Sequence, residues 1–225
     1  AAGARTYIVM PENAPRVKIE AVKAYGGEIS FCEPTEEARV RTCNQIIEET
    51  GAMFIPPFDH PDIIAGQATA AKELIEEVQD LDYVMTPVGG GGLAAGTCLS
   101  VKYLLPGSRV VLGEPKSVDD AYQSLKAGKI MPNKTTNTIA DGLKVTVGKL
   151  NFEIIKENVE EIVTVSEKEI VDAMRLIWER IKIVIEPSCS VPFAALLKRK
   201  KKFAGKKVGI ILTGGNVDLG KLPFN

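Results

Sequence analysis

The segment TPVGGGGLAAG, Thr86–Gly96, follows a predicted strand at Tyr83–Pro87 and leads into a predicted helix at Leu93–Leu104. Glycine has no Cβ, so four glycines in a row leave their backbone N–H groups open to a ligand. At the N-terminus of a helix, such amides and the helix dipole favour a phosphate group. The alternative is that the glycines only let the strand and the helix pack closely. We favour a phosphate site, because four consecutive glycines are more flexible than packing requires.

On both sides of this segment, short apolar runs alternate with helical patterns. Further predicted strands lie at Thr6–Met10, Glu28–Cys32, Met53–Ile55, Arg109–Gly113, Glu161–Val165 and Lys207–Leu212. Further predicted helices lie at Pro15–Tyr25, Thr35–Thr50, Ile63–Val78 and Glu167–Lys182. Alternating strands and helices favour parallel sheets, so the sequence predicts an α/β protein.

One proline-rich segment divides the predicted elements. PPFDHP, Pro56–Pro61, has three prolines in six residues, and prolines interrupt regular structure. We therefore expect a domain boundary here. A small α/β domain is predicted in residues 1–58 and a larger α/β domain in residues 59–225.

The composition excludes several classes of function. The 225 residues include 28 basic and 29 acidic ones, and this net charge of −1 gives no general attraction to nucleic acid or an anionic membrane. The sequence has no run of about 18 apolar residues, so it predicts no membrane span. The basic run Lys198–Lys207 is interpreted as the solvated end of a helix and a turn. Cys32, Cys43, Cys98 and Cys189 form no C-x-x-C pair, which argues against zinc and favours a reducing, cytoplasmic setting.

The glycine segment also fits a dinucleotide-binding pattern. Gly90, Gly92 and Ala95 match the loose G-x-G-x-x-G/A fingerprint. Glu114 lies near the position expected for a ribose-binding acid. The fingerprint is weak by itself, so on the local pattern alone a nicotinamide-binding domain remains open.

A second glycine motif, TGGNVD at Thr213–Asp218, follows the last predicted strand. Sheets of this kind bind ligands beyond the carboxyl ends of their parallel strands, where a hydroxyl and a glycine pair would lie here. The Thr213 hydroxyl can hydrogen-bond a neutral pyridine nitrogen, and an unprotonated ring nitrogen is a weaker electron sink than one paired with a carboxylate. A plain turn is the alternative.

Several motifs in register resemble one enzyme family. PVGGGGLAAG, GEPKSVDDAYQSLKAGK, TIADGLK, WERIKIVIEPS and LTGGNVD follow the order and spacing of serine racemases and serine-threonine dehydratases, and IPPFDHPDIIAGQATAAKEL is similar as well. The resemblance covers all 225 residues and outweighs the nicotinamide alternative. It implies a two-lobed fold type II enzyme with parallel-sheet lobes, like the β-subunit of tryptophan synthase, with pyridoxal 5′-phosphate (PLP) as cofactor. It also implies a cytoplasmic homodimer.

The resemblance implies which residues hold PLP. The tetraglycine loop binds the cofactor phosphate, the threonine before the late glycine pair faces the pyridine nitrogen, and residues of IADG and IEPS line the same pocket. In this chain they are Gly89, Gly90, Gly91, Gly92, Thr213, Asp141, Gly142 and Glu186. Cys189, in EPSCS, departs from the small, unreactive residues that relatives often have at its position.

Acidic residues after a predicted strand indicate a metal site. Glu114, Asp119 and Asp120 offer hard oxygen ligands that suit Mg²⁺, Mn²⁺ or Ca²⁺. The alternative is a helix N-terminus with acidic residues placed to suit its dipole. We favour the metal, and the resemblance implies that its ligands are Glu114, Asp120 and the backbone carbonyl of Val118.

The resemblance also implies an ATP effector site at a subunit interface. The matching positions are Lys18, Tyr25, Lys182 and Asn216. Cations and an aromatic ring suit a nucleoside triphosphate, although surface lysines and a tyrosine at a helix end are also commonplace.

The motifs that carry catalysis in this family have no match here. The family's Schiff-base lysine lies in an S-x-K-x-R-G stretch, and its opposite-face serine lies in an S-G-N-H-A/G-Q segment. Neither occurs in the 225 residues, so no catalytic residue is predicted within the chain. The chain resembles the C-terminal two-thirds of such an enzyme, and we expect an N-terminal part to be missing. His60 is predicted to be a surface loop residue.

The resemblance implies an enzyme that acts on small hydroxy amino acids. We expect the complete enzyme to racemise L-serine and to release ammonia from serine, threonine or 3-hydroxyaspartate. One alternative is a non-catalytic ligand-binding or interaction fragment of such an enzyme. A nicotinamide-binding domain is the least favoured alternative.

Overall fold

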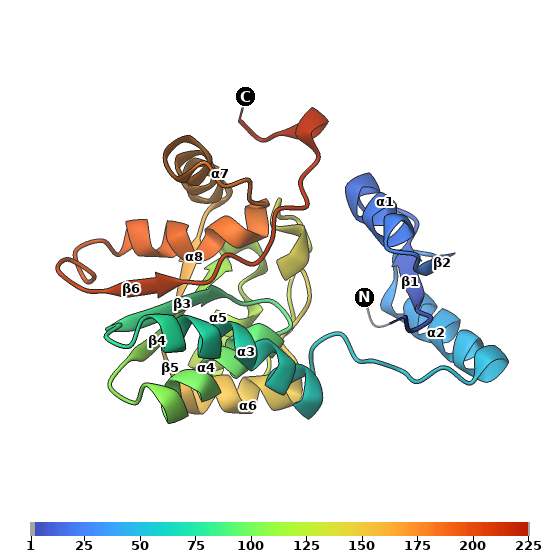
Figure 1. Cartoon of the computed structure of the whole chain (residues 1–225), viewed down its shortest axis with the longest axis horizontal. Helices are drawn as coiled ribbons and strands as arrows, with labels where there is room; N and C mark the ends of the chain where they lie inside the picture. The colour runs from blue at the N-terminus through green and yellow to red at the C-terminus, as the bar shows by residue number, and fades with distance from the viewer. Residues whose placement is uncertain (1–2, 225) are drawn as a thin grey trace. The chain divides into compact units, whose positions relative to one another are not determined.

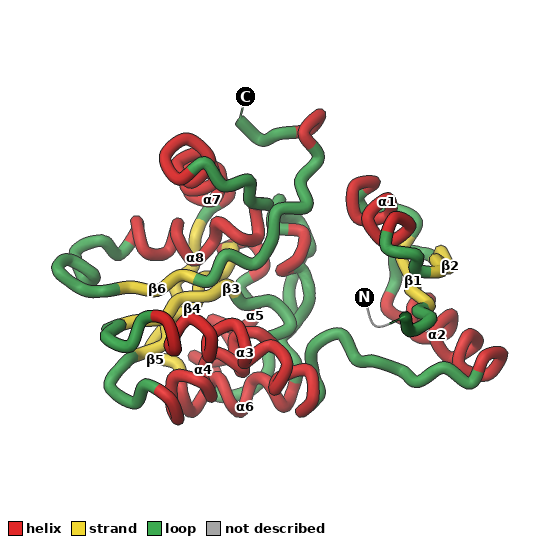
Figure 2. Tube along the Cα trace, viewed as in Figure 1, coloured by secondary structure: helices red, strands yellow, loops and turns green. Residues whose placement is uncertain are grey.

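The computed structural model describes residues 3–224, apart from the side chain of Glu36. The described chain forms two compact units, drawn in Figures 1 and 2. The first contains residues 3–55 and 216–223, and the second contains residues 56–215 and Phe224. The assignment of residues 1–58 and 59–225 to two domains stays a prediction.

The first unit is built on two parallel strands, β1 (Tyr7–Pro11) and β2 (Glu28–Cys32), which are joined by helix α1 (Arg16–Ala24). A longer helix, α2 (Glu36–Thr50), follows β2. The predicted strands and helices between Thr6 and Thr50 are confirmed, with ends that differ by no more than one residue. The unit also contains the short 3-10 helix η4 (Leu219–Lys221).

The ends of α2 follow from its sequence. The Thr35 hydroxyl caps its N-terminus by accepting a hydrogen bond from the backbone N–H of Ala38. Gly51 ends the helix in the left-handed conformation, with φ of 68°.

The predicted strand at Met53–Ile55 is wrong. These residues have no regular secondary structure, and the Met53 side chain is 83% exposed. A strand exists only where a neighbouring strand accepts its hydrogen bonds. Within residues 3–224 no strand pairs with this segment, so its β-forming side chains are not sufficient.

The second unit contains a four-stranded parallel sheet with helices on both faces. Its elements are α3 (Pro61–Glu77), β3 (Tyr83–Pro87), α4 (Gly92–Leu104), β4 (Arg109–Pro115), the 3-10 helix η1 (Lys116–Val118), α5 (Asp120–Ala127), the 3-10 helix η2 (Asp141–Leu143), α6 (Lys149–Asn158), β5 (Val159–Val165), α7 (Glu167–Leu176), the π-helix η3 (Ile177–Ile181), α8 (Pro187–Lys198) and β6 (Val208–Ile210). The strand order is β5-β4-β3-β6, and every neighbouring pair is parallel. The predicted α/β class is therefore confirmed.

Side chains alternate between two hydrophobic layers on the faces of this sheet. Val84 and Val110 face one layer, which contains α3, α4 and α6, whereas Met85 and Val111 face the other, which contains α7 and α8. Figure 1 shows these two groups of helices on opposite sides of the strands. Both faces of the central strands are covered, which is the usual environment of a parallel sheet.

Three helices of the second unit were not predicted, namely α5, α6 and α8. Helix α8 contains Pro192, and a proline inside a segment argues against a helix there. The predicted helix Glu167–Lys182 is interrupted, because α7 ends at Leu176 and a π-helical turn follows it. Lys182 then adopts a left-handed conformation with φ of 63°.

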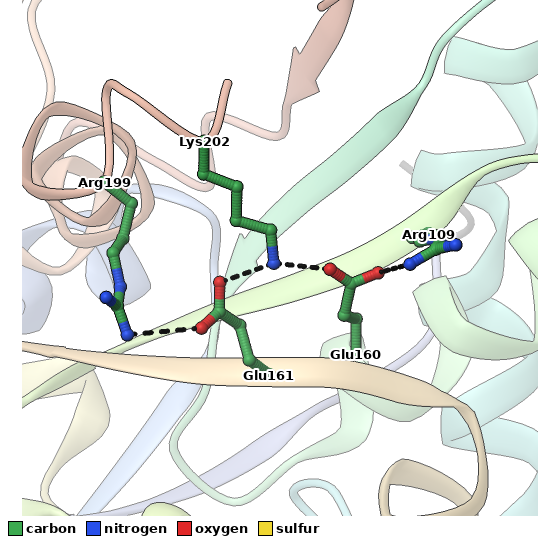
Figure 3. A network of polar contacts seen from close by, with 5 residues as sticks. All are labelled: Arg109, Glu160, Glu161, Arg199 and Lys202. Atoms are coloured by element: carbon green, nitrogen blue, oxygen red, sulfur yellow. Dashed lines mark hydrogen bonds and ion pairs between the residues drawn. The ribbon is translucent and has the colours of Figure 1, made fainter. Parts of the chain in front are cut away.

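Two residues of the basic run, Arg199 and Lys202, form ion pairs with acidic partners (Figure 3). Lys202 binds both Glu160 and Glu161 of β5, while Arg109 and Arg199 bind the outer sides of the same two carboxylates. Burial alone would raise the pKa of Glu160, but hydrogen bonds from Lys202 and Arg109 outweigh it and leave that pKa below its ordinary value. Arg199 and Lys202 of the run are therefore bound to the edge strand β5. No helix within residues 3–224 combines the length and the apolar character that crossing a membrane requires.

Candidate active site

The predicted cofactor residues gather at one edge of the second unit's sheet. β3 and β6 are neighbouring parallel strands, with Met85 opposite Ile210. The tetraglycine loop follows β3, and Thr213 follows β6. Because parallel neighbours end at the same edge of a sheet, both segments lie at the carboxyl edge, where such sheets bind ligands.

The tetraglycine loop presents backbone donors at the start of α4. The loop residues Gly89–Gly92 are buried, and Gly91 is the N-cap of the helix with φ of 93°. Among the hydrogen bonds of residues 3–224, none has a backbone N–H of these glycines as its donor. Buried N–H groups are rarely left without an acceptor. Their place at a helix N-terminus fits the phosphate group of a cofactor.

The opposite side of the loop is filled by protein. A Cβ on Gly90 would lie 2.4 Å from Cγ of Phe58, and a Cβ on Gly91 would lie 2.9 Å from Cβ of Asn151. A Cβ on Gly89 would lie 3.0 Å from Cα of Leu143. The glycines therefore also allow close packing, which was the alternative interpretation of the motif. The packing interpretation is therefore observed, while phosphate binding by the same residues stays a prediction.

The segment that begins at Glu186 connects the other predicted cofactor residues. The N–H of Glu186 donates to the carbonyl of Gly214 at 3.0 Å, and the hydroxyl of Ser188 accepts from the N–H of Gly142 at 3.1 Å. An added Cβ on Gly89 would also lie 3.3 Å from the carbonyl oxygen of Gly142. The structure thus brings the glycine loop, IADG, IEPS and TGG segments together. Their roles toward PLP stay predictions.

Cys189, the unusual residue of EPSCS, lies inside this arrangement. Its side chain is completely buried near the start of α8. Its Sγ accepts a hydrogen bond from the backbone N–H of Thr213 at 3.1 Å. The cysteine therefore supports the segment that carries the Thr213 hydroxyl.

The predicted metal ligands lie at the end of β4 and the start of α5. The Glu114 carboxylate accepts hydrogen bonds from the backbone N–H groups of Ala121 and Tyr122, both at 2.9 Å. Asp120 accepts from the side chain of Asn133 and from the backbone N–H of Val147, both at 2.7 Å. Both carboxylates are therefore held in fixed positions.

Burial governs the charge of these two carboxylates. It raises the pKa of Glu114 well above its ordinary value, and Asp120 nearby adds to the effect. Burial also raises the pKa of Asp120 to about 6. Val118, whose carbonyl is the third predicted ligand, is buried in η1. Within residues 3–224 no three His, Cys, Asp or Glu side chains form a metal cluster, and a set of two carboxylates and a carbonyl stays a prediction.

The predicted nucleotide residues are divided between the two units. Lys18, Tyr25 and Asn216 belong to the first unit, and Tyr25 is 89% exposed. Lys182 belongs to the second unit, where its Nζ donates to the carbonyl of Glu179 at 2.5 Å. The nucleotide site stays a prediction.

Three neighbouring residues near the glycine loop were not predicted to have a role. Phe58 and Asp59 were taken only as part of the boundary, and His60 as a surface loop residue. His60 is the N-cap of α3, where Nδ1 accepts from the N–H of Asp62 at 3.2 Å. The pattern D-H-P before a helical run could have indicated a cap, since proline is frequent at the first position of a helix.

Comparisons with known proteins identify the family of this chain. The family model for pyridoxal-phosphate dependent enzymes matches residues 1–214. A beta-hydroxyaspartate dehydratase from Paracoccus denitrificans is 50% identical over 218 residues, which cover 97% of this chain and 69% of the relative. A serine racemase from Dictyostelium discoideum is 50% identical over 223 residues, which cover 97% and 68%. The structure of maize serine racemase matches with a TM-score of 0.93 at 41% identity and covers 97% of this chain and 68% of that one. The chain therefore belongs to the family of pyridoxal-phosphate dependent enzymes.

Proposed function

We propose that this chain is part of a PLP-dependent enzyme. The enzyme racemises small hydroxy amino acids or converts them to 2-oxo acids and ammonia. Serine, threonine and 3-hydroxyaspartate are the proposed substrates, in keeping with the names of the relatives. The observation that carries the proposal is the row of buried backbone donors at Gly89–Gly92, which lack an acceptor among residues 3–224. A dianionic phosphate satisfies such donors.

The residues of this chain bind and orient the cofactor in this proposal. PLP supplies the electron sink that makes the α-proton of an amino acid acidic. Gly89–Gly92 hold its phosphate at the N-terminus of α4, and the Thr213 hydroxyl hydrogen-bonds its ring nitrogen. Asp141, Gly142 and Glu186 line the pocket from the segments joined through Ser188 and Gly214. No S-x-K-x-R-G stretch occurs in these 225 residues, so we assign no proton transfer to them.

The test uses the full-length protein. It should show the near-visible absorption of protein-bound PLP, and incubation with L-serine should yield D-serine and pyruvate in parallel assays. We expect pyruvate formation at least comparable to D-serine formation. Turnover of none of serine, threonine and 3-hydroxyaspartate would refute the proposed reaction even if PLP were bound. Binding of NAD without a PLP absorption band would refute the cofactor. A non-catalytic PLP-binding fragment would show the band without turnover.

We propose a divalent cation at Glu114, Asp120 and the carbonyl of Val118. Two buried carboxylates with raised pKa values favour either protonation or a compensating positive charge. Mg²⁺, Mn²⁺ and Ca²⁺ all prefer oxygen ligands of this kind. The rival explanation is that Glu114 serves only to cap α5 through the N–H groups of Ala121 and Tyr122.

The variant Asp120→Ala tests this cation. In the original protein, Mg²⁺ or Mn²⁺ should raise the melting temperature, and Asp120→Ala should abolish that rise, because one charged ligand is removed. Asp119→Ala is the matched control, since the Asp119 carboxylate accepts a hydrogen bond from Gln123 instead. An unchanged response to metal in Asp120→Ala would remove the site.

We also propose that ATP is an effector bound through Lys18, Tyr25, Lys182 and Asn216, in a cytoplasmic homodimer. The support is the match of these positions to the family pattern and the exposed ring of Tyr25. Tyr25→Ala should weaken ATP binding in a calorimetric titration. Tyr103→Ala, which removes another exposed tyrosine, should not. Equal ATP affinity in the two variants would contradict the site.

A further inference from the structure

We infer that Asn151 and Asp59 are positioning residues that hold the tetraglycine loop in the orientation that binds phosphate. Neither belongs to the loop, and the segment that carries Asp59 lies far from Asn151 in the sequence. The inference rests on the proposed PLP function, because the loop is its phosphate site. It adds to that function two side chains that act through the loop backbone.

Asn151 forms a bridge of two hydrogen bonds behind the loop. Its side-chain Nδ2 donates to the carbonyl of Gly90 at 2.8 Å and to the carbonyl of Phe58 at 3.1 Å. The residue is completely buried. The Gly90 carbonyl also accepts the backbone N–H of Gly148 at 3.0 Å. Both lone pairs of this oxygen are therefore occupied, which fixes the peptide unit that it belongs to.

Fixing the Gly90 carbonyl also fixes the N–H of Gly91. In a trans peptide unit the C=O and the following N–H point in opposite directions. The carbonyl points toward Asn151, so the Gly91 N–H points to the side of the loop away from Asn151. This N–H has no acceptor among the hydrogen bonds of residues 3–224. The bridge thus aims a free donor at the side where a phosphate can approach.

Asp59 in turn fixes Asn151. Its carboxylate accepts the backbone N–H of Lys149 at 3.0 Å and that of Asn151 at 3.1 Å. The N-cap of α6 is Gly148, which has no side chain to cap the helix, so Asp59 supplies the cap from a distant part of the chain. The approach is close, because a Cβ on Gly148 would lie 2.4 Å from Cγ of Asp59.

Phe58 completes the support from the same segment as Asp59. Its ring occupies the space that a side chain on Gly90 would need. Its carbonyl receives the second hydrogen bond of Asn151. One short segment, Phe58–Asp59, therefore contacts both the loop and the helix that carries Asn151. The amide nitrogen of Asn151 makes both side-chain hydrogen bonds, and its buried Oδ1 has no partner among residues 3–224.

The inference is tested with Asn151→Ala and Asp59→Asn. Asn151→Ala removes both donated hydrogen bonds, and we expect PLP to bind about tenfold more weakly. Asp59→Asn keeps one acceptor but places an NH₂ group against a backbone N–H, and we expect a loss of roughly threefold. The matched controls are Asn158→Ala, whose side chain bonds only within α6, and Asp62→Asn at the exposed start of α3.

Two measurements separate positioning from a purely structural role. The ³¹P resonance of bound PLP should move toward that of free PLP in Asn151→Ala, and remain unchanged in both controls. The affinity for pyridoxal, which has no phosphate, should be the same in the original protein and in Asn151→Ala. Circular dichroism establishes that each variant is folded. If Asn151→Ala does not fold, the same measurements on Asp59→Asn test the inference. This variant preserves the size of the side chain and therefore its packing.

The possible results have distinct meanings. Weaker PLP binding with an altered ³¹P resonance, and unchanged pyridoxal affinity, supports the inference. Equal PLP affinity and an identical resonance in the original protein and the folded variants would overturn the inference and leave the proposed function intact. Absence of PLP binding in the original protein would overturn both.

Discussion

Replacing Gly91 by alanine should destabilise the protein far more than the same change at Gly128. Both glycines have a positive φ, of 93° at Gly91 and 69° at Gly128. Alanine is strained in this backbone region at either position. Only at Gly91 would the new methyl group also collide with protein, because it would lie 2.9 Å from Cβ of Asn151 and 3.0 Å from Cγ2 of Val147. At Gly128 nothing lies within 4 Å.

The difference between the two variants isolates the cost of the collision. Backbone strain alone costs about 1 kcal/mol of unfolding free energy, and this is the expected effect of Gly128→Ala. An added methyl group in a closely packed site costs a further ~1–3 kcal/mol. Gly91→Ala should therefore lower the free energy of unfolding by about 2–4 kcal/mol.

Equilibrium unfolding in urea measures both values, provided that the slope against urea is the same in the two variants. PLP affinity, measured on the same samples, should fall in Gly91→Ala and stay unchanged in Gly128→Ala, since Gly128 is the C-cap of α5 and not part of the loop. Equal losses of stability would refute the packing argument, because they would mean that the space behind the loop adapts to a methyl group without cost.

Two further predictions concern groups near the site, and a third concerns Asp82 at the amino edge of the sheet. Trp178 is the single tryptophan, and its Nε1 donates to the carbonyl of Ile185 next to the proposed pocket. Its fluorescence should therefore change when PLP is titrated and stay constant with inorganic phosphate alone. Cys189 is buried, so a thiol reagent should modify it only on unfolding, and Cys189→Ala should lower the free energy of unfolding by about 1 kcal/mol through the lost acceptor. A backbone hydrogen bond from Lys207 holds the pKa of Asp82 below its ordinary value. This stabilisation is present above the unfolded-state pKa and is lost as the pH falls through the folded-state pKa, so Asp82→Asn should reduce the acid-induced loss of stability measured by melting temperature against pH.

The parts of the fold that the sequence predicts well are those specified by local patterns. The strand at Tyr83–Pro87 is observed with the same ends as predicted, and the helix after the glycines begins only one residue earlier than predicted. An apolar run, a glycine turn and a helical pattern follow one another there without competing signals. Thr35 and Gly51 likewise mark the ends of α2 through their own side chain or lack of one.

The wrong or missed secondary-structure elements are those whose structure depends on contacts with residues distant in the sequence. Met53–Ile55 has the composition of a strand and no strand partner within residues 3–224. Helix α8 has proline inside it, yet its buried face packs against α7 and the sheet, and tertiary packing outweighs a poor propensity. Helix α6 starts at a glycine with no side-chain cap of its own, so the sequence around it has no start signal.

The candidate site likewise has a part that the sequence predicts and a part that it does not. Its motifs and their order are visible in the sequence, because each is a local set of glycines, hydroxyls or carboxylates. The support behind the glycine loop is not visible, because Asp59 and the backbone N–H of Asn151 that it binds are 92 positions apart. Neither Asp59 nor Asn151 is part of a periodic or compositional pattern that would indicate their contact. Only the folded second unit makes them neighbours.

The glycine loop shows why the two interpretations of its sequence were not true alternatives. A loop that offers N–H groups on one side must have its carbonyls satisfied on the other, because peptide units carry both groups in opposite directions. Satisfying those carbonyls requires protein groups close to the backbone, and here they are Asn151 and Gly148. A Cβ on the loop would exclude such close groups. Free donors toward the ligand and close packing behind the loop therefore both require glycine. A substitution that adds a side chain to the loop should lower PLP affinity and stability together.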